Sequence, residues 1–477
     1  FAKIPMRDPA DSDEARRYIK MAFLLSREFD TPVFLRSTTR VSHSKSVVTL
    51  EERVEQRGAT GVVKNAAKYV MVPGMARGRR VVVENRMASL CNYAETFAEN
   101  RVEMNDASLG IITAGMTYNY AREAFPQASF LKLGMVHPLP EKMIRDFAAR
   151  VDKLYVIEEL DPVIEEQVRA MGIEVNGKDI FPYRNEFDPG VITESVTGES
   201  CGEIDPDLPD LPNRPPNLCP GCPHRGLFYV LGKLKVFVAG DIGCYTLSFL
   251  KPLEGLDSCL CMGASVGMAH GMSKAMDKKG VVVGVIGDST FVHSGITSLL
   301  NMAYNQSNAV IIICDNRTTA MTGMQDHPGT GVTLQGQRTK TLDFEKLALA
   351  LGIDNVRTVN PLDVKTTRTV IKEELATEGP SLVVAKAPCA LLKSKDSELS
   401  PPLMVDRDRC TGCKACLSIG CPAISWRRFD QLTGPVPEKK TKKQEGIALI
   451  DYTRCNGCTV CRQLCAAEAI VEVEDNE

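Results

Sequence analysis

Short apolar segments alternate with helical patterns between residues 217 and 395. Four of these segments read as strands: VFVAGDIG, VVVGVIGDS, AVIIICDN and SLVVAKAPC. Strands buried on both faces are nearly continuous apolar runs, and strands separated by helices form parallel sheets. The sequence therefore predicts an α/β domain with a doubly wound parallel sheet over residues 217–395.

A second α/β unit is predicted over residues 108–200. It starts with an apolar strand, a glycine turn and a helix in SLGIITAGMTYNYAREAF. A further strand, VDKLYVIEEL, and a further helix, VIEEQVRAMG, follow. The Pro-rich stretch PDLPDLPNRPPNLCP then interrupts the pattern, so residues 201–216 are predicted to be a linker.

The chain opens on one helix and one strand. DPADSDEARRYIKMAFLLSREFD predicts an amphipathic helix with Asp11 or Ser12 near its N-cap, and TPVFLRSTT predicts a strand. One helix and one strand make only the end of an α/β domain. We therefore assign residues 1–43 to the C-terminal remnant of a domain and expect a larger N-terminal part to be absent from this sequence. Residues 44–107 are charged and without a clear period, and are predicted to be an irregular connector.

Composition describes an ordinary globular protein with one exception. The 477 residues are 44% hydrophobic and 25% charged, with a net charge of -3, so we expect two to four domains. Without a basic excess, a long apolar run or a signal peptide, neither nucleic-acid nor membrane binding is predicted. The exception is the 17 cysteines. An odd number without a signal peptide favours metal or cluster binding in a reducing cytoplasm over a disulfide framework.

Eight of the cysteines form two regular runs in the tail. The runs are Cys410-x2-Cys413-x2-Cys416-x4-Cys421 and Cys455-x2-Cys458-x2-Cys461-x3-Cys465. In two-cluster ferredoxins the fourth cysteine of each run ligates the other cluster. We therefore predict two [4Fe–4S] clusters, one held by Cys410, Cys413, Cys416 and Cys465, the other by Cys455, Cys458, Cys461 and Cys421. Residues 402–477 would form a small α+β two-cluster ferredoxin-like domain. Two zinc sites are the alternative, although zinc sites seldom show this doubled spacing.

Polar residues follow two neighbouring strands of the central domain. One strand ends at Gly287-Asp288 and the next at Asp315-Asn316. Both ends lie at the carboxyl edge of a parallel sheet, where ligands bind. Asp288 and Asn316, with a backbone carbonyl near Thr318, suit Mg²⁺ held against phosphates. Gly287 and the following helix start let backbone N–H groups approach an anion. A Gly-Asp turn taken alone is more often structural.

The spacing from Gly287-Asp288 to Asn316 resembles the thiamine-diphosphate fingerprint, with Ser289 where glycine is usual. The chain as a whole resembles the thiamine-diphosphate 2-oxoacid:ferredoxin oxidoreductases, above all the alpha subunit of the indolepyruvate:ferredoxin enzymes. The resemblance is carried by CPGCPHR, GDIGCYTL, CMGASVGMAHG, GDSTFVHSG, CDNRTTAMTG and the two tail runs.

The resemblance implies an assignment for each segment. Residues 1–43 would end the pyrimidine-binding domain, residues 108–200 would be a transketolase-C-like domain, and residues 217–395 would bind the diphosphate. The cofactor-binding residues would be Gly243, Gly263, Ala264, Gly287, Ser289 and His224. The glutamate that activates thiamine in this family has no match in residues 1–40 and is expected upstream of Phe1.

The resemblance also implies a reaction and partners. An aryl pyruvate, coenzyme A and oxidised ferredoxin would give an aryl-acetyl-CoA, CO₂ and reduced ferredoxin, in the cytoplasm. The cofactors would be thiamine diphosphate, Mg²⁺ and iron–sulfur clusters. A smaller beta subunit would complete a dimer of alpha–beta pairs. Two alternatives stay open: a non-oxidative thiamine-dependent decarboxylase, and an electron-transfer subunit without thiamine chemistry of its own.

A further C-x-x-C lies far from the tail, in NLCPGCPHRG. Cys219 and Cys222 need two more thiolates to hold a cluster. Cys244 and Cys389 each follow a predicted strand, and strand ends at one edge of a parallel sheet converge. The resemblance supports the same four, because related pyruvate and 2-oxoglutarate enzymes hold a proximal [4Fe–4S] cluster with such a set. The alternative is a group of structural thiols lining a cofactor pocket.

Overall fold

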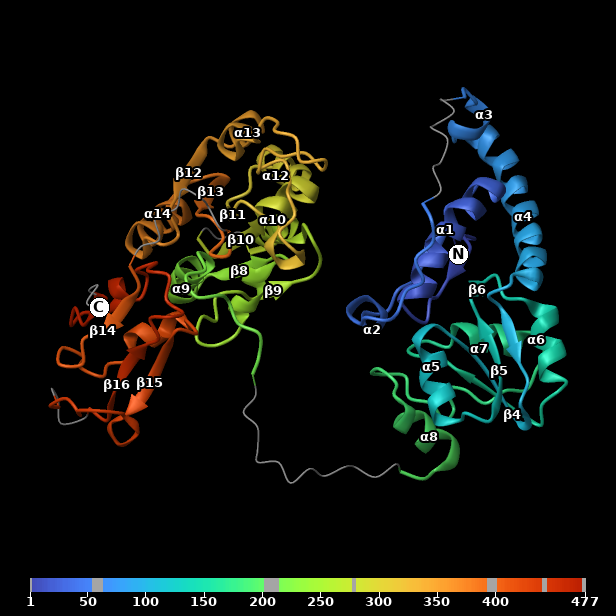
Figure 1. Cartoon of the computed structure of the whole chain (residues 1–477). Helices are drawn as coiled ribbons and strands as arrows, with labels where there is room; N and C mark the ends of the chain where they lie inside the picture. The colour runs from blue at the N-terminus through green and yellow to red at the C-terminus, as the bar shows by residue number, and fades with distance from the viewer. Residues whose placement is uncertain are drawn as a thin grey trace. The chain divides into compact units, whose positions relative to one another are not determined.

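The computed structural model describes residues 2–53, 63–200, 214–276, 280–392, 401–439 and 444–473. Contacts between residues divide the chain into two compact units, Phe1–Leu211 and Pro212–Glu477. The first unit runs from blue to green in Figure 1 and the second from green to red. The six segments expected from the sequence are therefore grouped into two bodies, each with its own core.

The first unit is built on a four-stranded sheet of order β3-β5-β4-β7. Strands β4, β5 and β7 are parallel, and β3 is antiparallel to β5. The elements of this part are β3 (Arg101–Glu103), β4 (Asp106–Ala114), α5 (Gly115–Ala124), β5 (Ala128–Leu133), α6 (Glu141–Ala148), β7 (Lys153–Ile157), α7 (Val163–Ala170) and α8 (Pro189–Thr197). The predicted strand–turn–helix start and the predicted second strand and helix are confirmed.

The opening helix and strands belong to the same body. Helix α1 (Ser12–Phe29) begins at the N-cap Asp11, whose side chain accepts the Glu14 N–H at 2.8 Å. Strand β1 (Met6–Arg7) pairs parallel to β2 (Phe34–Leu35) and antiparallel to β6 (Met135–His137). A short helix, α2 (Thr39–His43), follows. Residues 1–43 thus contribute to a small sheet shared with the α/β unit.

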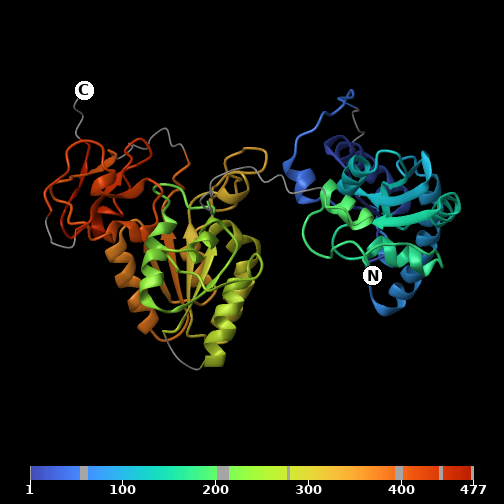
Figure 2. The same ribbon diagram turned by 90° about the horizontal axis from the view of Figure 1, so that it is seen from below.

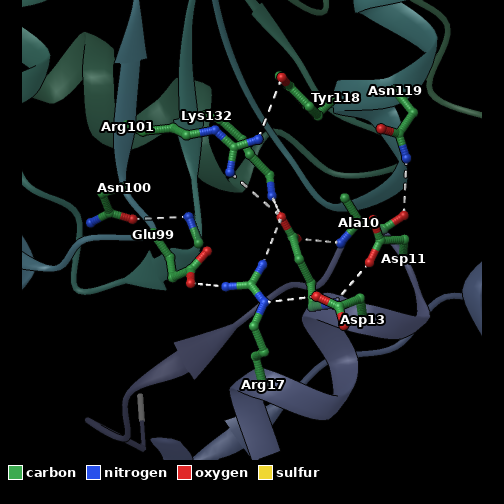
Figure 3. A network of polar contacts seen from close by, with 12 residues as sticks. Ala10, Asp11, Asp13, Arg17, Glu99, Asn100, Arg101, Tyr118, Asn119 and Lys132 are labelled. Carbon is green, nitrogen blue, oxygen red and sulfur yellow. Dashed lines mark hydrogen bonds and ion pairs between the residues drawn. The ribbon is translucent and has the colours of Figure 1, made fainter. Parts of the chain in front are cut away.

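A buried polar network fastens α1 to the sheet (Figure 3). The Glu14 carboxylate pairs with the Lys132 ammonium of β5, whose side chain is fully buried. Arg101 and Arg17 lie 3.7 and 4.0 Å from the same carboxylate. A buried charge is stable only when it is paired, so these contacts fix the helix on the sheet.

The segment predicted to be an irregular connector contains a long helix, so that prediction was wrong there. After α3 (Ala66–Tyr69), α4 runs from Pro73 to Thr96. Gly74, Gly78 and a run of valines obscure the apolar period from which a helix is recognised. Pro73 at the first helical position was the signal available, because its fixed φ and missing N–H suit a helix start.

The second unit contains a six-stranded, wholly parallel sheet of order β12-β13-β11-β10-β8-β9. Its strands are β8 (Phe237–Gly240), β9 (Ser258–Cys259), β10 (Val282–Gly287), β11 (Val310–Asp315), β12 (Asn355–Val359) and β13 (Ser381–Lys386). The parallel α/β sheet predicted for residues 217–395 is confirmed.

Helices flank this sheet on both sides (Figure 2). The helical elements are α9 (His224–Leu234), η1 (Cys244–Phe249), α10 (Ala264–Met276), α11 (Asp288–Thr290), η2 (Phe291–Gly295), α12 (Ile296–Tyr304), η3 (Ala320–Thr322), α13 (Phe344–Ala350) and α14 (Val364–Ala376). Along β11, Ile312 packs into the core that contains α9 residues, whereas Ile311 and Ile313 pack into the core that contains α12 residues. A strand covered on both faces has no polar side, and this explains the unbroken apolar run.

The tail has two halves of the same construction. Each half has a strand, a run of three cysteines that ends in or just before a 3₁₀ turn, a fourth cysteine and a second strand. The elements are β14 (Leu403–Val405), η4 (Ala415–Ile419), β15 (Ile424–Arg428), η5 (Phe429–Gln431), β16 (Gly446–Ile450), η6 (Arg462–Leu464) and β17 (Ile470–Glu472). Strands β14 and β17 pair antiparallel, as do β15 and β16. The identification of the tail as a ferredoxin-like domain stays a prediction.

Two further expectations meet the limits of the structure. The predicted linker, residues 201–216, lies outside the described residues except for residues 214–216. Among the helices that are described, none is both long and apolar enough to cross a membrane.

Candidate functional site

A cavity of about 250 Å³ opens at the carboxyl edge of the parallel sheet. Asp288 follows β10, and Asn316 and Thr318 follow β11, so all three predicted magnesium ligands line it. All three side chains are buried. Neighbouring parallel strands bring these residues together although they are distant in sequence, as the prediction required.

The oxygen atoms of this site are held by backbone N–H groups. Asp288 Oδ1 accepts the Ser289 N–H at 2.8 Å, and Oδ2 accepts the Arg317 N–H at 3.0 Å. Asn316 Oδ1 accepts the Thr318 N–H at 3.2 Å. A fixed carboxylate and amide oxygen are the donors that Mg²⁺ prefers, with waters or substrate phosphates completing its shell. The residues present therefore fit a magnesium ion bound against a diphosphate.

No three His, Cys, Asp or Glu side chains converge on one metal position within the described part of the chain. This agrees with the predicted magnesium set, which contains one carboxylate beside an amide and a backbone carbonyl.

Two histidines border the magnesium ligands. His224 Nε2 lies 3.5 Å from Asn316 Nδ2, and complete burial lowers the pKa of His224 to about 4. This imidazole is therefore neutral at pH 7. His327 Nδ1 accepts the Gly329 N–H at 3.1 Å, so a neutral ring carries its proton on Nε2, 3.2 Å from Asp288 Oδ2. The loop QDHPGTG, which follows β11, thus reaches the site.

The predicted cofactor-binding residues divide into two groups. Gly243, Gly287, Ser289 and His224 line the cavity. The Gly287 N–H donates to Tyr245 Oη at 2.9 Å, so this N–H is not free for an anion, contrary to the expectation.

Gly263 and Ala264 are not among the residues that line the cavity, although Met262 is. A Cβ on Gly263 would lie 2.0 Å from Ser294 Oγ, and φ is +94° there. Close packing and a left-handed backbone therefore explain this glycine.

Asp241 is a buried organising residue that sequence reasoning did not single out. Oδ1 accepts the N–H groups of Ile242 and Gly263, both at 2.8 Å, and Oδ2 accepts the Ser265 N–H at 3.1 Å. The carboxylate ties the end of β8 to the start of α10. The available signal was a second Gly-Asp pair at a strand end, in GDIGC.

The tail cysteines gather around two separate small cavities. Cys410, Cys413, Cys416 and Cys465 line one of them. Cys421, Cys455, Cys458 and Cys461 line the other. The fourth cysteine of each set comes from the other run, which is the arrangement that crossed ligation requires.

Burial and neighbouring thiols shape the chemistry of these groups. Burial, together with the charges of Cys410, Cys413 and Cys465, raises the pKa of Cys416 to about 11. Burial raises the pKa of Cys461, with Cys458, Cys421 and Cys455 adding to the effect. All eight thiols are free. Buried free thiols that repel one another as thiolates fit a cationic metal core, which is the group that ligating thiolates require.

The four cysteines of the predicted proximal site also lie near one another. Burial, together with the charges of Cys219 and Cys389, raises the pKa of Cys222 to about 12. Burial also raises the pKa of Cys244, and the same two cysteines contribute. Cys244 lines the cavity of Asp288, and the Cys389 N–H donates to the Asn316 carbonyl at 2.9 Å. The set therefore lies directly beside the predicted magnesium site.

The CPGC loop touches the tail. A Cβ on Gly221 would lie 1.9 Å from Asn456 Nδ2, so only a residue without a side chain fits. Pro220 and Gly221 line the same cavity as Cys421, Cys455, Cys458 and Cys461. The predicted proximal site and one tail site are therefore neighbours.

Comparisons with known proteins agree with this geometry. The family model described as "Thiamine pyrophosphate enzyme, C-terminal TPP binding domain" matches residues 241–385. This range spans β10, β11 and the cavity between their ends.

Full-length similarity is found to curated proteins. "Indolepyruvate oxidoreductase subunit IorA" of Thermococcus kodakarensis is 36% identical over 100% of this chain and 79% of its own length. The protein of the same name from Methanothermobacter thermautotrophicus is 34% identical over 98% of this chain and 77% of its own length.

The solved structure of a 2-oxoglutarate:ferredoxin oxidoreductase from Magnetococcus marinus is 20% identical in sequence, with a TM-score of 0.35. The match covers 48% of this chain and 83% of the solved chain. That similarity is too low to support a conclusion about this chain.

Proposed function

Since the chain belongs to the thiamine-diphosphate-dependent oxidoreductase family of the indolepyruvate oxidoreductase subunit IorA, we propose that it catalyses the oxidative decarboxylation of an aryl pyruvate. Coenzyme A would receive the acyl group to give an aryl-acetyl-CoA and CO₂. Ferredoxin would accept the two electrons. A smaller beta subunit would complete the enzyme, as a dimer of alpha–beta pairs.

One observation carries the proposal: the predicted magnesium ligands and the predicted proximal cysteines share one edge of one sheet. Cys244 lines the cavity that Asp288 and Asn316 line, and Cys389 is hydrogen bonded to Asn316. A site for decarboxylation alone needs no thiol set at this place. An electron acceptor next to the cofactor is what an oxidative reaction requires.

The chain's own residues would have distinct tasks. Asp288, Asn316 and the Thr318 carbonyl would hold Mg²⁺ on the diphosphate, and His327 would orient the Asp288 carboxylate. Thiamine diphosphate would supply the carbanion chemistry, and the [4Fe–4S] clusters one-electron transfer. The neutral His224 would line the cofactor cavity without adding charge.

Two other functions compete with oxidative decarboxylation. A non-oxidative decarboxylase would release CO₂ without reducing a cluster. An electron-transfer subunit would hold clusters without binding thiamine diphosphate. The thiol sets oppose the first of these, and the cavity with its fixed Asp288 and Asn316 oxygens opposes the second.

Anaerobic spectroscopy tests the proposal. Purified protein, with its beta subunit, is mixed with thiamine diphosphate, Mg²⁺, coenzyme A and indolepyruvate, and the visible absorbance of the clusters is followed. We expect bleaching that depends on both organic substrates. Release of CO₂ without bleaching would support the non-oxidative reading, and neither signal would support the electron-transfer reading.

A further inference from the structure

Arg225 is a buried cation without an ionic partner. It stands three residues after Cys222, the second cysteine of the C-x-x-C, and is 2% exposed. Its Nε donates to the Cys219 carbonyl at 3.0 Å, and Nη1 donates to the carbonyls of Ile419 at 2.9 Å and Gly420 at 2.7 Å. Nη2 donates to Asn217 Oδ1 at 3.2 Å and to the Leu218 carbonyl. All five N–H groups are thus satisfied, each by a neutral acceptor.

The charge itself is not compensated by these bonds. No carboxylate among the described residues pairs with Arg225, and no aromatic ring in that part of the chain stacks on it. Burying a charge is costly unless an opposite charge is near. The groups whose charge would favour the guanidinium are four thiols, Cys421, Cys222, Cys219 and Cys458.

Those four thiols belong to two of the predicted cluster sites. Cys421 and Cys458 belong to one tail set, and Arg225 itself lines that cavity. Cys219 and Cys222 belong to the proximal set. None belongs to the set of Cys410, Cys413, Cys416 and Cys465. A [4Fe–4S] core with four thiolates carries a net negative charge, and this would provide the opposite charge that the fold does not.

We propose that Arg225 is a positioning residue that sets the reduction potential of these two neighbouring clusters. The inference rests on the proposed function, because it requires the clusters. It also requires the fixed charge of the guanidinium. Taking up one electron makes a cluster more negative by one unit, with no bond broken and no proton needed. A fixed positive charge beside the cluster stabilises this reduced state, and net charge is one of the factors that set cluster potentials.

The size of the effect follows from Coulomb's law. At an effective dielectric constant of about 20, a unit charge roughly 10 Å away changes an equilibrium constant by about tenfold or more. Loss of the charge in Arg225→Gln should therefore lower the equilibrium constant for reduction by about tenfold, which is a shift of about 59 mV to lower potential for one electron. Arg225→Lys keeps the charge and should stay near the wild type.

The test is a potentiometric titration of the anaerobic protein with a chemical reductant and mediators, followed by electron paramagnetic resonance, without substrate. The cluster of Cys410, Cys413, Cys416 and Cys465 is the internal control and should shift less than the other two, because Arg225 does not line its cavity. Arg428→Gln, which removes an exposed arginine paired with Asp430, is the matched surface control. Unchanged potentials in a cluster-containing Arg225→Gln protein would overturn the inference, as would an equal shift of all clusters.

A second variant decides the question if Arg225→Gln does not assemble. Asn217→Asp places a carboxylate on Nη2 while Arg225 stays in its bonds, and should lower the same two potentials. If these potentials do not move, the charge at this place does not set them and the inference is wrong. Wild-type protein without a cluster at Cys421 would instead contradict the proposed function, so the two failures are distinguishable.

Discussion

The two units contain buried cations that are compensated in opposite ways. In the first unit Lys132 is paired with the Glu14 carboxylate of α1, inside a network of polar side chains. In the second unit Arg225 meets only neutral oxygens. A network that closes on itself stabilises a fold. A buried charge that the fold leaves unbalanced points to a bound group.

A third cation sharpens the comparison. Arg7 of the first unit is also fully buried, but its guanidinium lies 4.5 Å from the centre of the Phe97 ring and 6.0 Å from that of Tyr18. Ring faces attract cations. In the first unit a carboxylate therefore compensates Lys132 and ring faces attract Arg7, whereas Arg225 depends on what the cysteines hold.

The largest effect expected on the second unit is loss of the cofactor. Asp288→Ala removes the carboxylate from a desolvated metal site, so thiamine diphosphate and Mg²⁺ should no longer remain bound after gel filtration. Cluster absorbance should persist, because the thiol sets are separate. Asp326→Ala, an exposed change in the nearby loop, is the control. Stoichiometric thiamine diphosphate in purified Asp288→Ala would contradict the site.

Loss of one tail cluster is the next effect. Cys421→Ala should abolish the cluster of Cys455, Cys458 and Cys461, and Cys465→Ala the cluster of Cys410, Cys413 and Cys416. Paramagnetic resonance of the reduced variants should each time lose the coupling between two clusters. If each variant instead lost the cluster of its own run, the crossed assignment would be wrong.

Iron content tests whether the proximal thiols hold a cluster. Three cubanes correspond to about twelve irons per chain and two to about eight. Cys389→Ala should remove about four irons and leave both tail clusters, measured by iron and sulfide analysis of anaerobically purified protein. Cys314→Ala, which removes a thiol that lines the cavity but is outside the predicted set, should keep all of the irons. A wild-type content of about eight irons would exclude the third cluster.

A smaller effect is expected from breaking the closed network of the first unit. Glu14→Gln leaves the Lys132 ammonium buried without a carboxylate, and breaking such a pair costs about 3 to 5 kcal/mol. Hydrogen exchange should therefore accelerate in peptides that cover α1 and β5. Lys20→Ala, which removes an exposed ion pair with Glu51, should change it little. Equal protection in both variants would show that the network does not stabilise the unit.

The smallest effect concerns Asp8, a buried carboxylate of the first unit. Burial raises the pKa of Asp8 from 3.8 to about 6, against the lowering effect of Arg36. Between these values the folded state binds more protons than the unfolded state, so stability falls as pH rises from about 4 to about 6 and then stays constant. At pH 7 the ionised Asp8 therefore lowers the free energy of unfolding by about 3 kcal/mol relative to its value below pH 4.

Asp8→Asn should remove most of this pH-dependent loss of stability, because the amide cannot ionise. Hydrogen exchange of peptides that cover β1 and β6, measured at pH 4.5 and pH 7, checks this prediction. The variant should show a smaller difference in opening free energy between the two pH values than the wild type. An unchanged pH dependence would assign the effect to another group.

The candidate site at the sheet edge and the tail cysteines were predictable for different reasons. Fixed short spacings reveal the tail cysteines, because each triplet lies on one local loop. The strand-end rule reveals Asp288 and Asn316, because parallel strands end at one edge. Asp241 and His327 act through backbone N–H groups and a loop that folds back, and no local pattern encodes such contacts. Helix α4 was missed because its interior glycines and valines contradict helical propensity.

The contacts of the tail with the sheet domain have one more consequence. Gln463 accepts the Val364 N–H at 3.0 Å and donates to the Leu362 carbonyl at 2.7 Å, at the start of α14. A domain on a flexible tether finds its target by diffusion, at a local concentration that the tether sets. Here the second unit holds the tail in place, and no docking encounter is needed. A more viscous solvent should then slow the arrival of an external electron acceptor. It should not slow the electron transfer that comes before, within the chain.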